Sequence, residues 1–318
     1  MNRIIFPLLA GTVLLLAGCK KDNGSGSGTD PDQLITPRLV AAEHETPFTG
    51  ALEVFPCKHG TTIYFGNYFN DRLSFFNALY TIFEGNVYST PRPITLPIGE
   101  YNLIYWGVSQ LQEPTYISGA IHSPGIGLNN DLSRENYSLR EYPGADTTYY
   151  PVYDFVFAKQ EVDIGAESIS VSLQRVVAGL TVLLQKDDHT ELDPEIASID
   201  VLIGNIAEEL DFATGEPQNQ TKTVRFPITI DDNNMSAVNP IALVFPSAPN
   251  PPLTIVLKLK DGTIRTFRTV LNNELKANTK LTVTVNMGEI LDSETTAGGF
   301  EVNKWEEKSE TVNAEPVP

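Results

Sequence analysis

The strongest constraint on the fold of this chain is a period-two alternation of apolar and polar side chains. From residue 168 to 173, three serines alternate with isoleucine, valine and leucine, and a similar alternation runs on to Leu184. The pattern returns at residues 253–259 and 281–287. Successive side chains of a strand point to opposite faces of a sheet, so the alternation predicts half-buried strands. The chain is therefore expected to be all-β, with Leu180 and Leu257 buried.

Turn-forming residues support the same fold class. The chain contains 22 prolines and 23 glycines at short intervals, which leaves little room for long helices. Asp261-Gly262 separates two alternating runs and predicts a β-hairpin with a type I′ turn, because both residues tolerate a positive φ. Residues 73–83 have apolar spacings that also suit a helix, but the β-rich surroundings favour a strand.

The first nineteen residues have the layout of a secretion signal. Arg3 is followed by a largely apolar run over residues 4–16 and then by Ala17-Gly18-Cys19. The run is too short to cross a bilayer, which takes about 20 residues. Leu16-Ala17-Gly18-Cys19 resembles the bacterial lipobox, in which the cysteine is lipidated and the preceding bond is cut. We therefore expect residues 1–18 to be a signal peptide and Cys19 to hold the mature protein in the outer membrane.

The segment after the signal peptide is predicted to be a flexible tether. Residues 19–36 begin with a Gly/Ser-rich stretch that has no large apolar side chain to bury. The whole chain has a net charge of −18, and its only basic pair in this region is Lys20-Lys21, next to the lipid. This excess of acidic over basic residues argues against nucleic-acid binding. Once Cys19 is lipidated no intrachain disulfide can form, and we expect Cys57 to be buried among strands.

A change in composition predicts two domains. Residues 37–162 hold most of the aromatic side chains, whereas residues 163–291 are aliphatic and regularly alternating. Each part has the length of one β-sandwich. Residues 292–318 form an acidic, polar tail, and three apolar side chains in it predict one short additional strand: Phe300, Val302 and Trp305.

Catalytic and metal-binding signatures are missing from the sequence. It contains none of the short motifs of metalloproteases, serine hydrolases or phosphate-binding loops. Its four histidines are scattered: His44, His59, His122 and His189. Asp187-Asp188 and Asp231-Asp232 are typical of solvated turns, where aspartate bonds to its own backbone. We predict a non-enzymatic protein with no catalytic, cofactor or metal site.

Several stretches together resemble a known family. Residues 94–107 contain a Leu-Pro-x-Gly-x-Tyr sequence, an apolar run and Trp-Gly, and residues 173–182 begin with Leu-x-Arg before small and aliphatic residues. Later matches lie at residues 244–247, 275–283 and 300–306. In order and spacing these stretches resemble the fimbrillins of Bacteroidales and their anchor or accessory subunits, the FimB/Mfa2-like group.

The resemblance implies two tandem transthyretin-like, Greek-key β-sandwiches and a place in surface fimbriae, or pili, that support adhesion to a host or bacterial surface ligand. Such subunits join other fimbrial subunits by β-strand addition, in which an extended segment of one fills a groove in the next. In stalk subunits an arginine-specific protease first removes the N-terminal segment, and Arg38 is the candidate processing site here. The candidate strand-exchange residues are Phe300, Val302 and Trp305. Stalk, anchor and tip roles all remain open.

Two other classes of function remain open. One is a glycan-binding lipoprotein of a polysaccharide-utilisation system, in which flat, exposed aromatic rings stack on sugars. Its candidate rings are Tyr137, Tyr142, Tyr149, Tyr150 and Tyr153. The other is an exported enzyme on a sandwich scaffold, which requires a pocket with convergent carboxylates.

Overall fold

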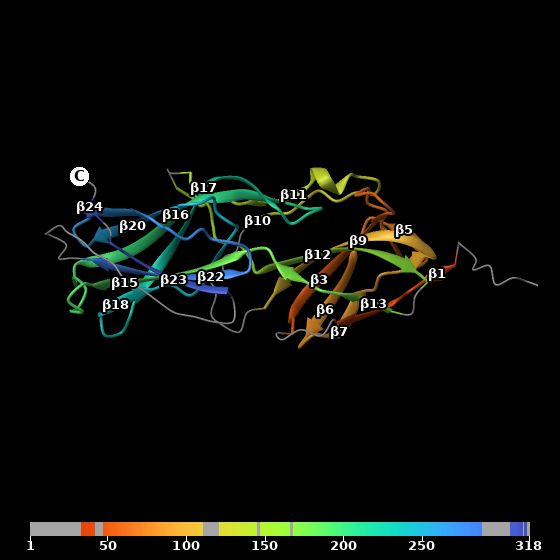
Figure 1. The fold of residues 1–318 in the computed structure, drawn as a ribbon, viewed down its shortest axis with the longest axis horizontal. Coiled ribbons are helices and arrows are strands. Elements are labelled where there is room, and N and C mark those ends of the chain that lie inside the picture. The colour runs from red at the N-terminus through yellow and green to blue at the C-terminus, as the bar shows by residue number, and fades with distance from the viewer. Residues whose placement is uncertain are drawn as a thin grey trace, which may run out of the picture.

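The computed structural model describes residues 33–41, 47–110, 121–144, 147–165, 168–287, 306–313 and 315–316. The molecule is elongated, with strands β1–β9 at one end and strands β15–β24 at the other (Figure 1). Within the described residues the only helix is a single 3₁₀ turn, η1 (Leu132–Arg134), and no helix is suited to spanning a membrane. The predicted all-β class is confirmed.

The N-terminal end is built on a six-stranded sheet with the order β14-β12-β9-β3-β6-β7. Three two-stranded pairs, β1-β8, β2-β13 and β4-β5, accompany it. The strands of this end are β1 (Leu34–Ile35), β2 (Arg38–Ala41), β3 (Gly50–Lys58), β4 (Asn67–Phe69), β5 (Arg72–Ser74), β6 (Ala78–Phe83), β7 (Asn86–Arg92), β8 (Leu96–Pro97), β9 (Gly99–Ser109), β12 (Phe155–Ile164), β13 (Ser168–Val171) and β14 (Gln174–Arg175).

Strand β9 explains why the apolar run before Trp106 does not alternate. Tyr101, Leu103 and Tyr105 belong to a small core cluster beneath β1, β2, β8 and β13. Ile104 and Trp106 point to the opposite face and belong to a large cluster that continues into the C-terminal end. A strand that is buried on both faces becomes continuously apolar.

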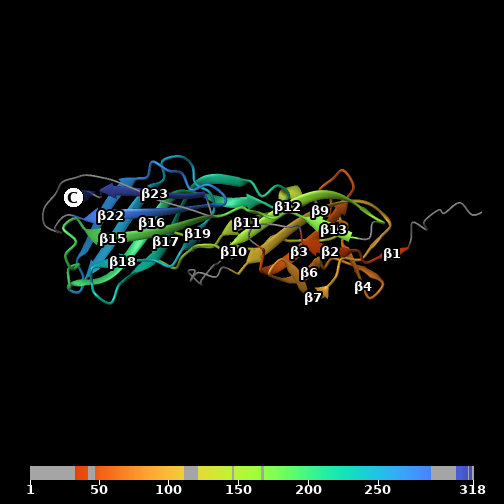
Figure 2. The same ribbon diagram turned by 60° about the horizontal axis from the view of Figure 1, so that its bottom comes forward.

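The C-terminal end is a twelve-stranded sheet whose main path is β23-β22-β15-β18-β17-β16-β20-β21-β24 (Figure 2). Strands β10, β11 and β19 pair off this path. The strands are β10 (Ile121–His122), β11 (Asn136–Leu139), β15 (Ala178–Lys186), β16 (Ile196–Asp211), β17 (Pro217–Ile230), β18 (Ser236–Val238), β19 (Ala242–Val244), β20 (Pro252–Leu259), β21 (Ile264–Val270), β22 (Thr279–Met287), β23 (Glu306–Asn313) and β24 (Glu315–Pro316).

The predicted strand registers in this sheet are confirmed. Leu180 on β15 and Leu257 on β20 are both fully buried. β15 pairs with β19 near its start and with β18 further along, and the buried Asn239 lies between these two pairings. There the Asn239 side chain takes the place of a main-chain partner. Its Oδ1 accepts from Val182 N at 2.7 Å, and its Nδ2 donates to Leu180 O at 2.9 Å. The ladder along β15 therefore continues without an unpaired group at this point.

The hairpin predicted at Asp261-Gly262 joins β20 to β21, but its turn is not type I′. Only Gly262 has a positive φ, of 89°. Main-chain bonds close the turn, from Leu259 N to Thr263 O at 2.8 Å and from Gly262 N to Leu259 O at 3.0 Å. The Asp261 side chain adds an acceptor for Thr263 N at 2.8 Å. The strand interpretation of residues 73–83 is confirmed, since strands β5 and β6 occupy most of this stretch.

The two ends are joined by an apolar interface and by strand pairing. Trp106 Nε1 donates to Phe212 O at 2.9 Å, and the Phe55 and Phe212 rings meet edge-on with centroids 4.9 Å apart. Strand β11 lies before the predicted boundary but pairs with β16, whereas β13 lies after it and pairs with β2. The division into domains 37–162 and 163–291 remains a prediction, and sheet pairing crosses its boundary in both directions.

Candidate functional site

The terminal segments contain every predicted site residue, and only one of these residues is described. Cys19, in the predicted linker 19–36, and Phe300, Val302 and Trp305 lie outside the described residues. Arg38 is the first residue of β2 and is exposed, while its neighbours Pro37 and Leu39 are buried.

The N-terminal segment is attached to the body by two short pairings. β1 pairs with β8, and β2 runs parallel to β13 from Arg38–Ser168 to Ala41–Val171. Leu39 packs into the small core cluster, and a cavity of about 490 Å³ lies between residues 36–39 and strands β6 and β7. A cut after Arg38 would detach β1 and leave the rest of β2 on β13.

The C-terminal segment, residues 306–316, pairs with both ends of the large sheet. β23 runs parallel to β22 from Thr279–Glu306 to Asn286–Asn313, and β24 pairs with β21 at Arg268–Glu315 and Phe267–Pro316. Figure 2 shows β23 beside β22. The segment therefore covers two strands that would otherwise be edges.

A buried carboxylate holds this segment in place. Glu310 on β23 is 6% exposed. Its Oε1 accepts from Asn272 N at 2.7 Å, and its Oε2 accepts from Asn273 N at 3.0 Å and Asn273 Nδ2 at 3.1 Å. Hydrogen bonds to an ionised acceptor are roughly twice as strong as neutral ones. The sequence gives no sign of the burial of Glu310, because the stretch from Glu306 to Asn313 has no apolar alternation that marks a core-facing position.

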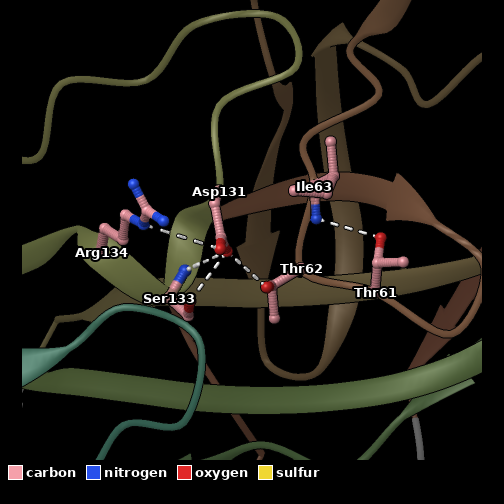
Figure 3. A network of polar contacts seen from close by, with 6 residues as sticks. All are labelled: Thr61, Thr62, Ile63, Asp131, Ser133 and Arg134. Carbon is pink, nitrogen blue, oxygen red and sulfur yellow. Dashed lines mark hydrogen bonds and ion pairs between the residues drawn. The ribbon is translucent and has the colours of Figure 1, made fainter.

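A second polar network, around Asp131, is structural (Figure 3). Asp131 caps η1: its Oδ1 accepts from Thr62 Oγ1 at 2.6 Å, Ser133 Oγ at 2.8 Å and Ser133 N at 3.1 Å. Arg134 Nε lies 3.9 Å from Oδ2. The hydroxyl of Thr62, followed by the Ser133 donors, lowers the pKa of Asp131. The network ties the loop after β3 to η1.

The residues considered as metal ligands are separate from one another. Within the described residues no three His, Cys, Asp or Glu side chains gather as a metal site, and His44 lies outside them. Asp188 accepts from Thr190 Oγ1 at 2.7 Å, which lowers the pKa of its carboxyl, and Asp231 accepts from Ser236 Oγ at 2.8 Å. Both aspartates thus occupy the solvated turns that the sequence predicts.

The predicted burial of Cys57 is confirmed. The residue is fully buried on β3, and its burial raises the pKa of the thiol to about 12. The thiol is therefore protonated at neutral pH and is shielded from reagents in solution.

The tyrosines considered for glycan stacking do not form a flat exposed pair. Tyr137 and Tyr149 are buried in the large core cluster. The rings of Tyr142 and Tyr150 are half-buried and inclined by 44°, and Tyr153 is exposed by 41%. This geometry gives the glycan-binding alternative no support.

Comparisons with known proteins find similar solved structures and one matching protein family. Structural similarity extends to the fimbrial anchor protein Mfa2 from Porphyromonas gingivalis, with a TM-score of 0.42, 12% identity and coverage of 71% of this chain and 76% of that one. A candidate adhesin from Bacteroides ovatus gives a TM-score of 0.48, 11% identity and coverage of 74% and 81%, respectively.

No curated protein sequence matches the chain. The model of one protein family, described as fimbrillin-A associated anchor proteins Mfa1 and Mfa2, matches residues 38–311. This match covers most of the sequence and includes both the strand that begins at Arg38 and most of β23. The chain therefore belongs to the family of fimbrillin-A associated anchor proteins Mfa1 and Mfa2.

Proposed function

We propose that this protein is a non-enzymatic, lipid-anchored component of surface fimbriae that joins other fimbrial subunits by β-strand addition and so supports adhesion. Family membership supports the fimbrial role. In this proposal the two ends of the molecule are the two transthyretin-like sandwiches, and lipid on Cys19 holds them at the outer membrane. Arg38 is the processing site if the protein serves as a stalk subunit, while an anchor keeps the lipid.

The observation that carries the assembly proposal is the pairing of residues 306–316 with both β22 and β21. A subunit that joins by strand addition needs a terminal segment that completes a sheet through main-chain hydrogen bonds and can be replaced by an equivalent segment. Residues 306–316 meet the first condition. The pairing of β22 with β15 does not involve residues 306–316, so these residues can leave the sheet without breaking it.

Deleting residues 292–318 should abolish incorporation into fibres and leave a folded protein. The pairing of β22 with β15, and of β21 with β20, does not involve the tail. Cells that lack the native gene would produce the truncated protein, and immunogold electron microscopy would score the fibres. Circular dichroism of the purified truncated protein would test the fold.

A variant that lacks residues 22–30 is the matched control, because it shortens the predicted tether and keeps both Cys19 and the tail. It should enter fibres normally. Normal incorporation of the tail-deleted protein would remove the tail from the mechanism. Unaltered fibres, adhesion and biofilm in cells without the gene would contradict the fimbrial role itself.

Replacing Cys19 with alanine should abolish lipid labelling and release the protein from the membrane fraction. Anchoring by several acyl chains depends on this thiol, and each buried CH₂ contributes about 0.8 kcal/mol to membrane binding. Metabolic labelling with a palmitate analogue, followed by fractionation, measures both effects. Cys57→Ala is the control, since the buried thiol of Cys57 should have no part in labelling. A Cys19→Ala protein that stays in the membrane fraction would contradict the lipoprotein proposal.

A further inference from the structure

Among the described residues only two carboxylates are buried, and they are held in different ways. Asp154 is paired with the guanidinium of Arg175. Glu310 is bound instead by main-chain and amide N–H groups of residues 272–273. A buried carboxylate without hydrogen-bond donors is strongly disfavoured, so these donors determine whether β23 can pair in this position.

The position of Glu310 in the ladder directs it inward. Its partner on β22 is Val283, which is fully buried. Directly paired residues of parallel strands share a face of the sheet, so Glu310 lies on the core side of an edge strand. Charged residues that point inward on an edge strand are disfavoured in any other pairing of that strand.

The loop that binds the carboxylate is held by contacts that do not involve the tail. Leu271 N donates to Pro251 O at 3.0 Å. On the other side of the loop, Ser247 N donates to Leu275 O at 2.9 Å and Leu275 N donates to Ser247 Oγ at 2.9 Å. Because both flanks of residues 272–273 are fixed in this way, the loop has its shape before the carboxylate arrives. Preorganised donors lose little entropy on binding.

The neighbouring registers of β23 leave the N–H groups of this loop without an acceptor. A shift by one residue turns Glu310 to the other face of the sheet. A shift by two residues moves it by about 7 Å along the strand and brings Lys308 or Val312 to its place. Neither of those side chains can accept a hydrogen bond, so the loop N–H groups would lose their acceptor.

We propose that residues 272–273 form a carboxylate-binding socket that sets the register of the closing strand. Its ligand is a glutamate on an extended segment, in the position of Glu310. Under the proposed function, on which this part rests, the segment that enters the socket during assembly is residues 306–316 of a second copy of this chain. Glu310 is thus the specificity-determining residue of strand addition.

Hydrogen exchange of the full-length protein tests the socket directly. Glu310→Gln should speed the exchange of amides in residues 272–275 and 279–286 at least tenfold, because the neutral amide loses the charge-assisted bonds and adds a donor. Glu307→Gln is the matched control: it makes the same charge change three positions before Glu310 on the same strand, opposite Lys280 and not Val283, and should alter exchange less than twofold. Equal exchange in Glu310→Gln and the unmodified protein would overturn the proposal.

A coupling experiment separates recognition from general destabilisation. Asn273→Ala removes one of the three donors and should raise exchange in the same residues. If Glu310 acts through the socket, Asn273→Ala should add less than twofold to the effect of Glu310→Gln, whereas independent effects would multiply. Multiplicative effects would overturn the proposal. Fibre incorporation of Glu310→Gln is scored separately: altered exchange with normal fibres supports the socket and contradicts strand addition by this tail.

Discussion

Replacing Trp106 with alanine should lower the free energy of unfolding by about 3–5 kcal/mol, the usual range for removing a buried tryptophan. Trp106 is almost fully buried at the junction of the two ends of the molecule. Its ring lies within 6 Å, centroid to centroid, of Tyr137, Phe155, Phe157 and Phe212. Chemical denaturation followed by circular dichroism measures the change.

The partial substitution Trp106→Phe separates packing from hydrogen bonding. It keeps an aromatic ring but leaves Phe212 O without its donor, which should cost about 1–3 kcal/mol. Because the large core cluster contains residues of both ends, hydrogen exchange in β9 and in β16 should rise together in Trp106→Ala. A rise confined to β9 would contradict the conclusion that the two ends share a core.

Replacing Arg175 with alanine should destabilise the protein by about 3–5 kcal/mol, because it leaves the Asp154 carboxylate buried without its counter-charge. The side chains of Asp154 and Arg175 are 2% and 21% exposed. The pair is bidentate, with Nε 2.5 Å from Oδ1 and Nη2 2.8 Å from Oδ2. It holds β14 against the residues that lead into β12, and thermal and chemical unfolding measure its contribution.

The double variant Asp154→Asn, Arg175→Met removes both charges and should recover part of the lost stability. Arg134→Ala is the matched control, since its side chain is 84% exposed and its contact with Asp131 is long. Arg134→Ala should change stability several-fold less than Arg175→Ala. If the double variant is no more stable than Arg175→Ala alone, the unpaired charge of Asp154 is not the cause of the lost stability.

The sequence predicts the strands of this fold better than their partners. Alternation identifies β15, β20 and β22 and the inward direction of Leu180 and Leu257, because both follow from the geometry of a single strand. The pairing of β11 with β16 joins residues 136–138 to 209–211, and local periodicity contains no information about it. In the same way, the run before Trp106 predicts a strand but not the two different cores on its faces.

The candidate site is predicted in part. The acidic tail was expected to contribute a strand around Phe300–Trp305, and those residues lie outside the described part of the chain; the described strand is β23, which begins at Glu306. The burial of Glu310 cannot be predicted from the sequence, because it depends on donors of Asn272 and Asn273, which are distant in sequence. Arg175 belongs to a stretch that resembles the family, but its partner Asp154 becomes apparent only in the folded chain.

The pairing of residues 306–316 with both β21 and β22 also bears on how the chain folds during export. In the export proposed above, the protein would emerge from the translocation channel with its N-terminus first, so β21 and β22 would be exposed to solvent before the strands that cover them have crossed the membrane. During this interval the C-terminal sheet has two unprotected edges, the kind of surface through which partly synthesised chains aggregate. A chaperone that binds such edges would be expected to contact this chain at β21 and β22.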